Sequence, residues 1–210
     1  MSSNYILHGA PRSRSSRIVW VLEELEVDWH WRPLSFRAGE HRSPSFLAMN
    51  PGGKVPVLQH GELVLTESAA IARYLAAQHP DSGLLPPEGT AEAALVDRWL
   101  CFVTTELEQA LWTKAKHTFA LPAKLRVDAV RQTAEAEFRR AASVADTMLG
   151  SRRHAVGEAF TIADIFLAHT CSWARSGRLW DSLSPALQAY AQTQLARPAW
   201  KRAVERETAS

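Results

Sequence analysis

Lys54-Val-Pro-Val-Leu-Gln-His-Gly-Glu-Leu-Val-Leu-Thr-Glu-Ser68 is the stretch that decides the fold of the N-terminal half. Its two apolar runs, Val55–Leu58 and Glu62–Leu65, flank the dipeptide His60-Gly61 and predict a β-hairpin. Pro56 has no N–H to donate to a ladder, so it belongs at a strand edge. If the Val55–Pro56 bond is cis, the backbone N–H and C=O of Val55 can turn outward and pair with an extended peptide. The alternative is an ordinary edge proline that serves no ligand.

The end of the same stretch, Thr66-Glu67-Ser68, leads into a predicted helix over Ser68–Gln78. A serine at a helix start, with free N–H groups behind it, can hold a carboxylate. Glu67 can accept a hydrogen bond from an ammonium group. The pair therefore suits the zwitterionic end of an amino acid, although Ser68 as a simple helix cap is the alternative.

The chain before this stretch adds two strands and a helix. Tyr5–His8 and Trp29–Leu34 alternate as strands do, and apolar residues from Ile18 to Leu25 recur near helical spacing. The order is βαβ followed by ββα, which predicts an α/β domain.

The turn between the first strand and the first helix, Ala10-Pro-Arg-Ser-Arg-Ser-Ser-Arg17, is a candidate anion site. A helix N-terminus exposes unpaired N–H groups and a partial positive charge. Any of the three hydroxyls of Ser13, Ser15 and Ser16 could hydrogen-bond a thiolate there. The alternative is that these serines only cap the helix.

The second half contains only helical signals. Residues from Leu95 to Leu111 and from Ala134 to Met148 carry apolar stripes at spacings of three and four. Another helix is predicted from Thr161, where Thr161-Ile-Ala-Asp164 is a capping box, so we interpret Asp164 as structural. Shorter helices are expected after Ser184 and Pro198. The Pro-rich segment 80–87 indicates a linker between the two halves, and we predict the domain boundary near residue 85.

Composition excludes several classes of protein. The net charge is +2 and no concentrated basic run occurs, which argues against nucleic-acid binding. No apolar stretch approaches the ~20 residues that span a bilayer, so a cytoplasmic protein without membrane contact is expected. Cys101 and Cys171 form no C-x-x-C pair, so no metal site is expected. We expect two buried thiols, although a disulfide between them is conceivable.

Three segments in fixed order carry a family resemblance: Gly39-Glu-His-Arg-Ser-Pro-Ser-Phe-Leu-Ala-Met-Asn-Pro51, Gly53-Lys-Val-Pro-Val-Leu58 and Leu65-Thr-Glu-Ser-Ala-Ala-Ile-Ala-Arg-Tyr-Leu75. With the capping box, they make the chain similar to the cytosolic glutathione transferase superfamily, and most similar to serine-type, theta- and phi-like bacterial or fungal members. The resemblance implies a thioredoxin-like α/β domain over residues 1–80. It also implies an all-α helical-bundle domain over residues 88–210.

The resemblance also implies roles for individual residues. Ser13 would stabilise the glutathione thiolate, with Ser15 and Ser16 as alternates, and Arg12 or Arg14 could supply charge. The other expected glutathione contacts are His41 with the glycyl end, Lys54 beside the peptide, Val55 with the cysteinyl backbone next to cis-Pro56, and Glu67 with Ser68 at the γ-glutamyl group.

The implied activity is conjugation of glutathione, as co-substrate, to small apolar electrophiles in detoxification, by a homodimer. The electrophile is expected between the domains, against Trp112, His117 and Phe119. The alternatives are a glutathione-binding carrier or interaction protein without turnover, or a glutathione-dependent isomerase, dehalogenase or peroxidase on the same fold.

Overall fold

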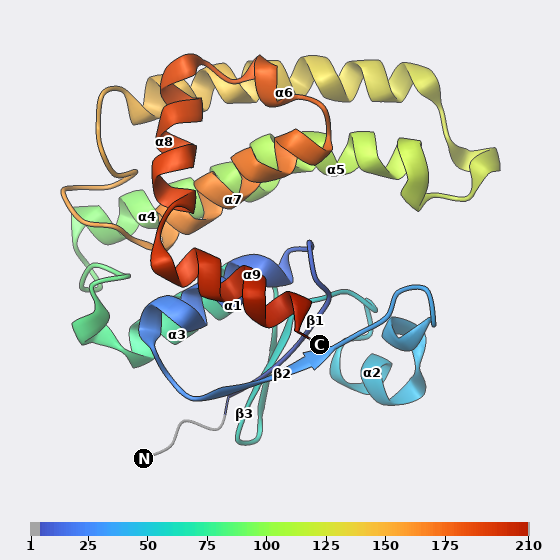
Figure 1. Cartoon of the computed structure of the whole chain (residues 1–210), viewed down its shortest axis with the longest axis horizontal. Helices are drawn as coiled ribbons and strands as arrows, with labels where there is room; N and C mark the ends of the chain where they lie inside the picture. Colours follow the sequence, from blue (N-terminus) through green and yellow to red (C-terminus); the bar gives the residue numbers. More distant parts are fainter. Residues whose placement is uncertain (1–4, 210) are drawn as a thin grey trace. The chain divides into compact units, whose positions relative to one another are not determined.

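The computed structural model describes residues 5–209 (Figure 1). The chain divides into two compact units. The first comprises the chain up to Leu85 together with the segment that begins at Ala196, and the second runs from Pro86 to Leu195. Each unit is described below by itself.

The first unit is built on a four-stranded mixed sheet in the order β2-β1-β3-β4. Strand β1 (Tyr5–Gly9) pairs in parallel with β2 (Trp29–Pro33) and antiparallel with β3 (Val57–His60). Strand β4 (Leu63–Thr66) closes the predicted hairpin, with His60 opposite Leu63. The hairpin ladder begins after Pro56, because a proline cannot donate to it.

Two of the helices in this unit follow the chain order expected from the sequence, and a third was not expected. Helix α1 (Ser15–Leu25) lies between β1 and β2, and α3 (Ser68–Gln78) follows β4. Helix α2 (Pro44–Met49), which follows the short 3-10 turn η1 (Glu40–Arg42), lies in a segment for which no helix was predicted. Ser43 caps α2 by accepting a hydrogen bond from the backbone N–H of Phe46. The thioredoxin-like fold expected for the N-terminal half is confirmed.

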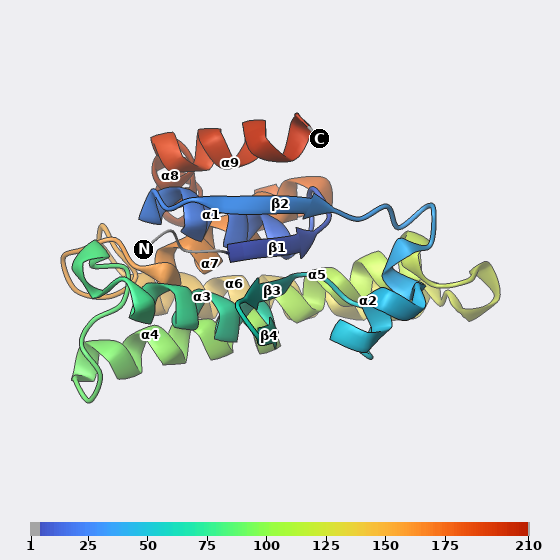
Figure 2. The same ribbon diagram turned by 90° about the horizontal axis from the view of Figure 1, so that it is seen from below.

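The last helix, α9 (Pro198–Thr208), runs beside α1 in both views (Figures 1 and 2). The guanidinium of Arg197 makes two hydrogen bonds to the Glu24 carboxylate, at 2.6 and 2.8 Å. Residues from 196 onward therefore belong to the first unit, whereas the family resemblance implied one helical domain over residues 88–210. The sequence does not indicate this assignment, because the spacing of apolar residues on a helix shows which face is buried and does not show which domain covers that face.

The second unit is helical throughout, and residues 86–195, all of which the structure describes, contain no strand. Two π-helical segments, η3 (Val103–Leu107) and η4 (Lys116–Ala120), continue the helices α4 (Ala91–Phe102) and α5 (Glu108–Ala115). Together they form one long run that lies against α6 (Asp128–Leu149). The elements are α4 (Ala91–Phe102), η3 (Val103–Leu107), α5 (Glu108–Ala115), η4 (Lys116–Ala120), η5 (Ala123–Leu125), α6 (Asp128–Leu149), α7 (Ile162–Ser176), η6 (Trp180–Ser182) and α8 (Pro185–Leu195).

Asp164 is structural, as predicted. It completes the capping box with Thr161 at the start of α7. Its carboxylate also accepts hydrogen bonds from the backbone N–H of Ala155 at 2.8 Å and from the hydroxyl of Tyr190 at 2.6 Å. Every buried oxygen of this carboxylate thus has a donor, which is the condition for burying such a group at tolerable cost.

The two cysteines are free thiols in different surroundings. Cys171 is buried in α7, and burial raises the pKa of its thiol to about 12. Cys101 is exposed, so the expectation of two buried thiols is wrong for this residue. The buried face of α4 passes through Val96, Trp99 and Leu100. Successive helical residues are about 100° apart around the axis, so Cys101, the next residue, lies off this face.

Within residues 5–209, no helix combines the length and hydropathy needed to cross a membrane. The same residues contain no group of three histidine, cysteine or acidic side chains placed to hold a metal ion.

Candidate functional site

The candidate site lies at the turn between β1 and α1, where the backbone of Gly9 comes close to the side chain of Ser15. A Cβ at Gly9 would lie 2.5 Å from Ser15 Oγ and 2.6 Å from Ser15 Cβ, so only glycine fits. Ser15 is completely buried, and its Oγ accepts a hydrogen bond from the backbone N–H of Ala10 at 3.3 Å. The turn 10–14 is therefore tied to the first residue of the helix.

The three serines of this turn are not equivalent. Ser15 and Ser16 are buried, at 0% and 3% exposure, whereas Ser13 is half-buried. The Ser13 hydroxyl donates to the carbonyl of Ala10 at 2.6 Å and accepts from the backbone N–H of Ser15 at 3.0 Å. It therefore performs part of the capping role that was the alternative, yet it remains the one hydroxyl of the three with access to a ligand.

Ser16 is engaged by the C-terminal helix. Its hydroxyl hydrogen-bonds the carboxylate of Glu207 on α9, with oxygen–oxygen distances of 2.8 and 3.0 Å. Arg12 is exposed and has a left-handed backbone with φ of 56°, and its backbone N–H and its charge both act to lower the pKa of the same carboxylate. Sequence reasoning missed Glu207 because its partners lie almost the whole chain away.

Two arginines concentrate positive charge at the start of α1. Arg17 is fully buried, and its pKa is held well below its ordinary value, first by burial and then by the charge of Arg14. Arg14 is half-buried, which lowers its pKa, while the charge of Glu67 acts in the opposite direction. Helices α1 and α3 pack against each other, and the charge of Glu67 reaches Arg14.

Glu67 and Ser68 occupy the start of α3 as the sequence predicts. Glu67 is exposed and has φ of 65°, a left-handed backbone that residues other than glycine rarely adopt. Ser68 follows as the first helical residue and is 6% exposed. Strained backbone of this kind is common where a ligand is clamped.

The Val55–Pro56 peptide bond is cis, in agreement with the expectation for Pro56. Val55 and Pro56 are buried and Lys54 is exposed. The side chain of Asn50 donates to the carbonyl of Lys54 at 2.7 Å and thereby holds the approach to the cis bond. Val55 shares a hydrophobic cluster with Ala10, so the cis-proline segment and the serine turn are neighbours.

His41 lies in η1, with its ring edge-on to Phe36 at 5.0 Å between centroids. Its Nδ1 is buried and has no hydrogen-bond partner among the described residues. A Cβ on Gly53, whose φ is 59°, would lie 2.9 Å from the His41 carbonyl oxygen. His41 therefore lies beside the 53–56 segment, and its buried nitrogen is available for an additional partner.

The three predicted electrophile residues lie on the continuous run α5–η4 of the second unit. Trp112 is in α5 and is half-buried, and Phe119 in η4 is 66% exposed. His117 Nδ1 accepts a hydrogen bond from the backbone N–H of Val127 at 3.1 Å, which fastens η4 to the residue before α6. His117 thus has a structural contact that the sequence did not indicate.

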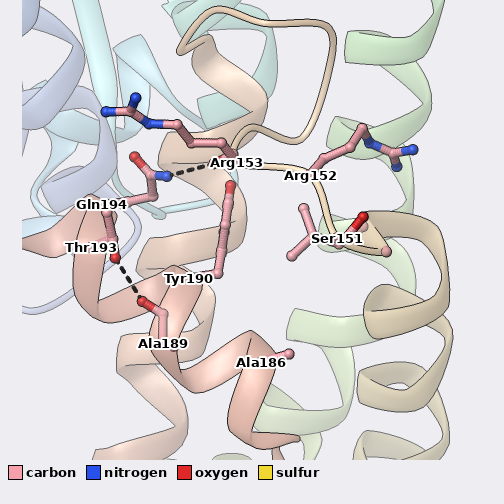
Figure 3. Close-up of a pocket in the computed structure, with 10 residues that line it drawn as sticks. Ser151, Arg152, Arg153, Ala186, Ala189, Tyr190, Thr193 and Gln194 are labelled. Carbon is pink, nitrogen blue, oxygen red and sulfur yellow. Dashed lines mark hydrogen bonds between the residues drawn. The ribbon is translucent and has the colours of Figure 1, made fainter.

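The second unit also contains a cavity of about 240 Å³ between the end of α6 and α8 (Figure 3). Its polar groups are largely engaged with their own surroundings: Gln194 donates to the Arg153 carbonyl at 3.0 Å and Tyr190 to Asp164. The guanidinium groups of Arg152 and Arg153 point to opposite sides in Figure 3. None of the predicted site residues lines this cavity.

Comparison with known proteins agrees with this geometry. Residues 3–77 match the family model of the glutathione S-transferase N-terminal domain, and residues 128–193 match that of the C-terminal domain. "Glutathione S-transferase 4" of Zea mays is 33% identical over 188 residues, covering 88% of this chain and 84% of its own. "Glutathione S-transferase" of Hyoscyamus muticus is 29% identical over 209 residues, covering 95% and 97%.

Solved structures give the same result. A glutathione transferase from Methylococcus capsulatus superposes with a TM-score of 0.85 at 28% identity, covering 98% of this chain and 100% of that chain. Glutathione transferase F7 from Populus trichocarpa superposes with a TM-score of 0.84 at 25% identity, covering 97% and 99%. The chain belongs to the glutathione S-transferase family of enzymes.

Proposed function

We propose that the protein joins the sulfur of glutathione to small apolar electrophiles, and that Ser13 keeps this sulfur in its thiolate form. One observation carries the choice of Ser13. The hydroxyls of Ser15 and Ser16 are buried and bonded within the protein, whereas Ser13 at the same helix start is partly exposed. Serine acts here as a hydrogen-bond donor to sulfur and not as a nucleophile.

The energy required is modest. A free thiol has a pKa near ~8.5, so it is mostly protonated at neutral pH. Lowering that pKa by about two units takes roughly 2.7 kcal/mol. A hydrogen bond to a charged group supplies about 1.5–3 kcal/mol and a helix N-terminus about 0.3–1 kcal/mol. To donate to sulfur, the Ser13 hydroxyl must turn away from the Ala10 carbonyl. It then exchanges a neutral acceptor for a charged one, and hydrogen bonds to charged acceptors are the stronger kind.

The remaining contacts orient the peptide. The backbone of Val55, next to cis-Pro56, is proposed to pair with the cysteinyl residue of glutathione, with Lys54 alongside. Ser68 and the N-terminus of α3 suit the γ-glutamyl carboxylate, and Glu67 suits its ammonium group. The buried Nδ1 of His41, which has no hydrogen-bond partner among the described residues, supports a contact between the His41 ring and the glycyl end of glutathione.

The reaction follows from these placements. The thiol proton leaves to solvent, and the sulfur lone pair forms a bond to the electrophilic carbon. With an aryl halide, the halide departs with the electron pair of the carbon–halogen bond. Positioning the two reactants converts an encounter in solution into a reaction within one complex, which lowers the entropic barrier.

The finer assignments belong to the same proposal. We place the protein among serine-type, theta- and phi-like transferases, working as a cytoplasmic homodimer in detoxification. Trp112 and Phe119 are proposed to contact the apolar electrophile, because both offer aromatic surface that is not fully buried. His117 keeps a place in this set, although its Nδ1 already binds the Val127 N–H.

The test is the rate of glutathione conjugation to a generic aryl halide, together with an absorbance titration of the bound thiolate. In Ser13→Ala, we expect the pKa of bound glutathione to rise and the rate at neutral pH to fall at least tenfold. Ser143→Ala, an exposed serine on α6, is the matched control and should behave as wild type. An unchanged titration in Ser13→Ala would remove Ser13 from this role. Binding of glutathione without turnover across many electrophiles would favour a carrier.

A further inference from the structure

Helix α9 carries a carboxylate where its pattern calls for a small apolar side chain. The face turned to the core passes through Ala199, Ala203 and Glu207, at four-residue intervals and with 4%, 1% and 7% exposure. The helix runs alongside α1 in both ribbon views (Figures 1 and 2). Glu207 therefore completes a buried stripe instead of facing solvent.

Burial of this carboxylate is unfavourable in itself. Desolvation raises the pKa of Glu207, whereas the hydrogen bonds from Ser16 and from the Arg12 backbone, and the charge of Arg12, act in the opposite direction. Apolar residues of similar volume are usually as stable as a buried ion at such a position. Residues that break a local packing rule concentrate at functional sites, so the contacts of Glu207 need a functional explanation.

Those contacts bracket Ser13 on both sides along the chain. One residue before it, the backbone N–H of Arg12 faces the Glu207 carboxylate and lowers its pKa. Three residues after it, Ser16 donates its hydroxyl to the same carboxylate at 2.8 and 3.0 Å. A single side chain thus holds both ends of the short segment that carries the Ser13 hydroxyl.

The conformation that is held is one that the chain would not adopt by preference. Arg12 has φ of 56°, which is unfavourable for a residue with a Cβ. In this conformation its backbone N–H faces the Glu207 carboxylate. The Glu207 carboxylate also lies at the N-terminus of α1, where the partial positive charge of the helix favours an anion.

We infer that Glu207 is a positioning residue, which holds Arg12 and Ser16 and so keeps Ser13 where its hydroxyl can turn to the sulfur of glutathione. The inference rests on the proposed role of Ser13. Glu207 acts through hydrogen bonds to the turn, and the segment from Ala196 is thereby part of the machinery for thiolate formation. Misplacing a reacting group by about 1 Å can reduce a rate up to about 100-fold.

The experiment compares Glu207→Ala and Glu207→Gln with wild type in the full-length protein. The readouts are the pKa of bound glutathione, kcat and KM with an aryl halide, and thermal stability. We expect Glu207→Ala to raise the thiol pKa by about one unit and to lower kcat about tenfold, with little change in the KM for glutathione. Glu207→Gln keeps an acceptor of the same shape and should restore most of both values.

Two controls keep the outcome specific. Glu205→Gln changes an exposed carboxylate on the same helix and should match wild type. The double variant Ser13→Ala/Glu207→Ala should be no worse than Ser13→Ala alone, because Glu207 acts through Ser13. If Glu207→Ala does not fold, Ser16→Ala replaces it, because this variant removes the hydrogen bond from Ser16 to Glu207. Ser16→Ala should then show a partial rise in the thiol pKa and a partial loss of kcat, whereas Glu207→Gln should stay close to wild type.

The results that overturn the inference are distinct from those that overturn the proposed function. A folded Glu207→Ala with the wild-type thiol pKa overturns the positioning role, as does Glu207→Gln with the full defect of the alanine variant. Additive losses in the double variant also contradict it. An unchanged thiol pKa in Ser13→Ala contradicts the role of Ser13 itself, whatever Glu207 does.

Discussion

Gly9 and Ser15 approach each other so closely that a Cβ on Gly9 would lie 2.5 Å from the Ser15 Oγ. The same Cβ would also lie 2.6 Å from the indole of Trp31. Real Cβ atoms do not tolerate such distances, and Ser15 cannot retreat because it is the first residue of α1. The missing side chain is what allows β1 and α1 to meet at the turn that carries Ser13.

Gly9→Ala should therefore destabilise the protein. Overpacking of this kind costs about 1–3 kcal/mol, which for a chain of this length lowers Tm by roughly 2–10 °C. Thermal unfolding followed by circular dichroism measures it. Gly177→Ala is the matched control, because a Cβ there would meet its nearest atom at 3.5 Å, an ordinary contact. Equal melting temperatures for wild type and Gly9→Ala would show that the turn can yield.

Glu67 offers a way to separate backbone strain from ligand binding. Glu67→Gly removes the carboxylate and also accommodates the φ of 65°, whereas Glu67→Gln removes only the charge. We expect the KM for glutathione to rise about tenfold or more in both, since a hydrogen bond to a charged group is lost. Melting temperature should not fall in Glu67→Gly, because relief of strain offsets the added chain entropy.

Steady-state kinetics with varied glutathione, and the melting curves of both variants, measure these two effects. Glu62→Gln, an exposed carboxylate in the hairpin turn, should leave KM unchanged. Wild-type KM in both Glu67 variants would mean that this side chain does not contact the substrate.

The ion pair between Lys114 on α5 and Glu135 on α6 should make stability depend on pH. Lys114 Nζ lies 2.7 Å from the carboxylate, and this hydrogen bond is the main cause that lowers the pKa of Glu135, against the effect of burial. A carboxyl with a lowered pKa in the folded state stabilises the protein above its unfolded pKa, near ~4.3. That contribution is lost as pH falls through the folded value.

Because both side chains remain partly exposed, the contribution is about 0.5–1 kcal/mol, screened by salt. Wild type should melt a few degrees above Glu135→Gln at pH 7, and the gap should narrow as the pH falls below about 4. A gap of the same size at pH 3.5 would assign the effect to packing of the side chain instead of its charge.

The two thiols should react very differently. Cys101 is exposed, whereas burial raises the pKa of Cys171 to about 12, so almost no thiolate forms there. Native protein at pH 8 should therefore release one equivalent of chromophore from Ellman's reagent, and two in guanidinium chloride. Cys101→Ser should abolish the native reaction. Rapid labelling of two thiols in native protein would show that α7 opens readily.

Much of the local structure follows from the sequence because its causes are local. The hairpin around His60-Gly61 and the helix from Ser68 rest on turn chemistry and periodicity that neighbouring residues supply. The capping box from Thr161 to Asp164 is likewise complete within four residues. Helix α2 was missed because its six residues are too few to show a period, although the Ser43 cap followed by Pro44 is a local signal for a helix start.

The sequence by itself determined the family, the order of the elements and the set of candidate side chains. Only the tertiary structure distinguished the three serines: it buries Ser15 against Gly9 and Ser16 beside Glu207, and leaves Ser13 partly exposed. It also assigned α9 to the first unit. The burial of these serines and their hydrogen bonds depend on residues far away along the chain, and a local sequence pattern does not show which distant side chain will contact them.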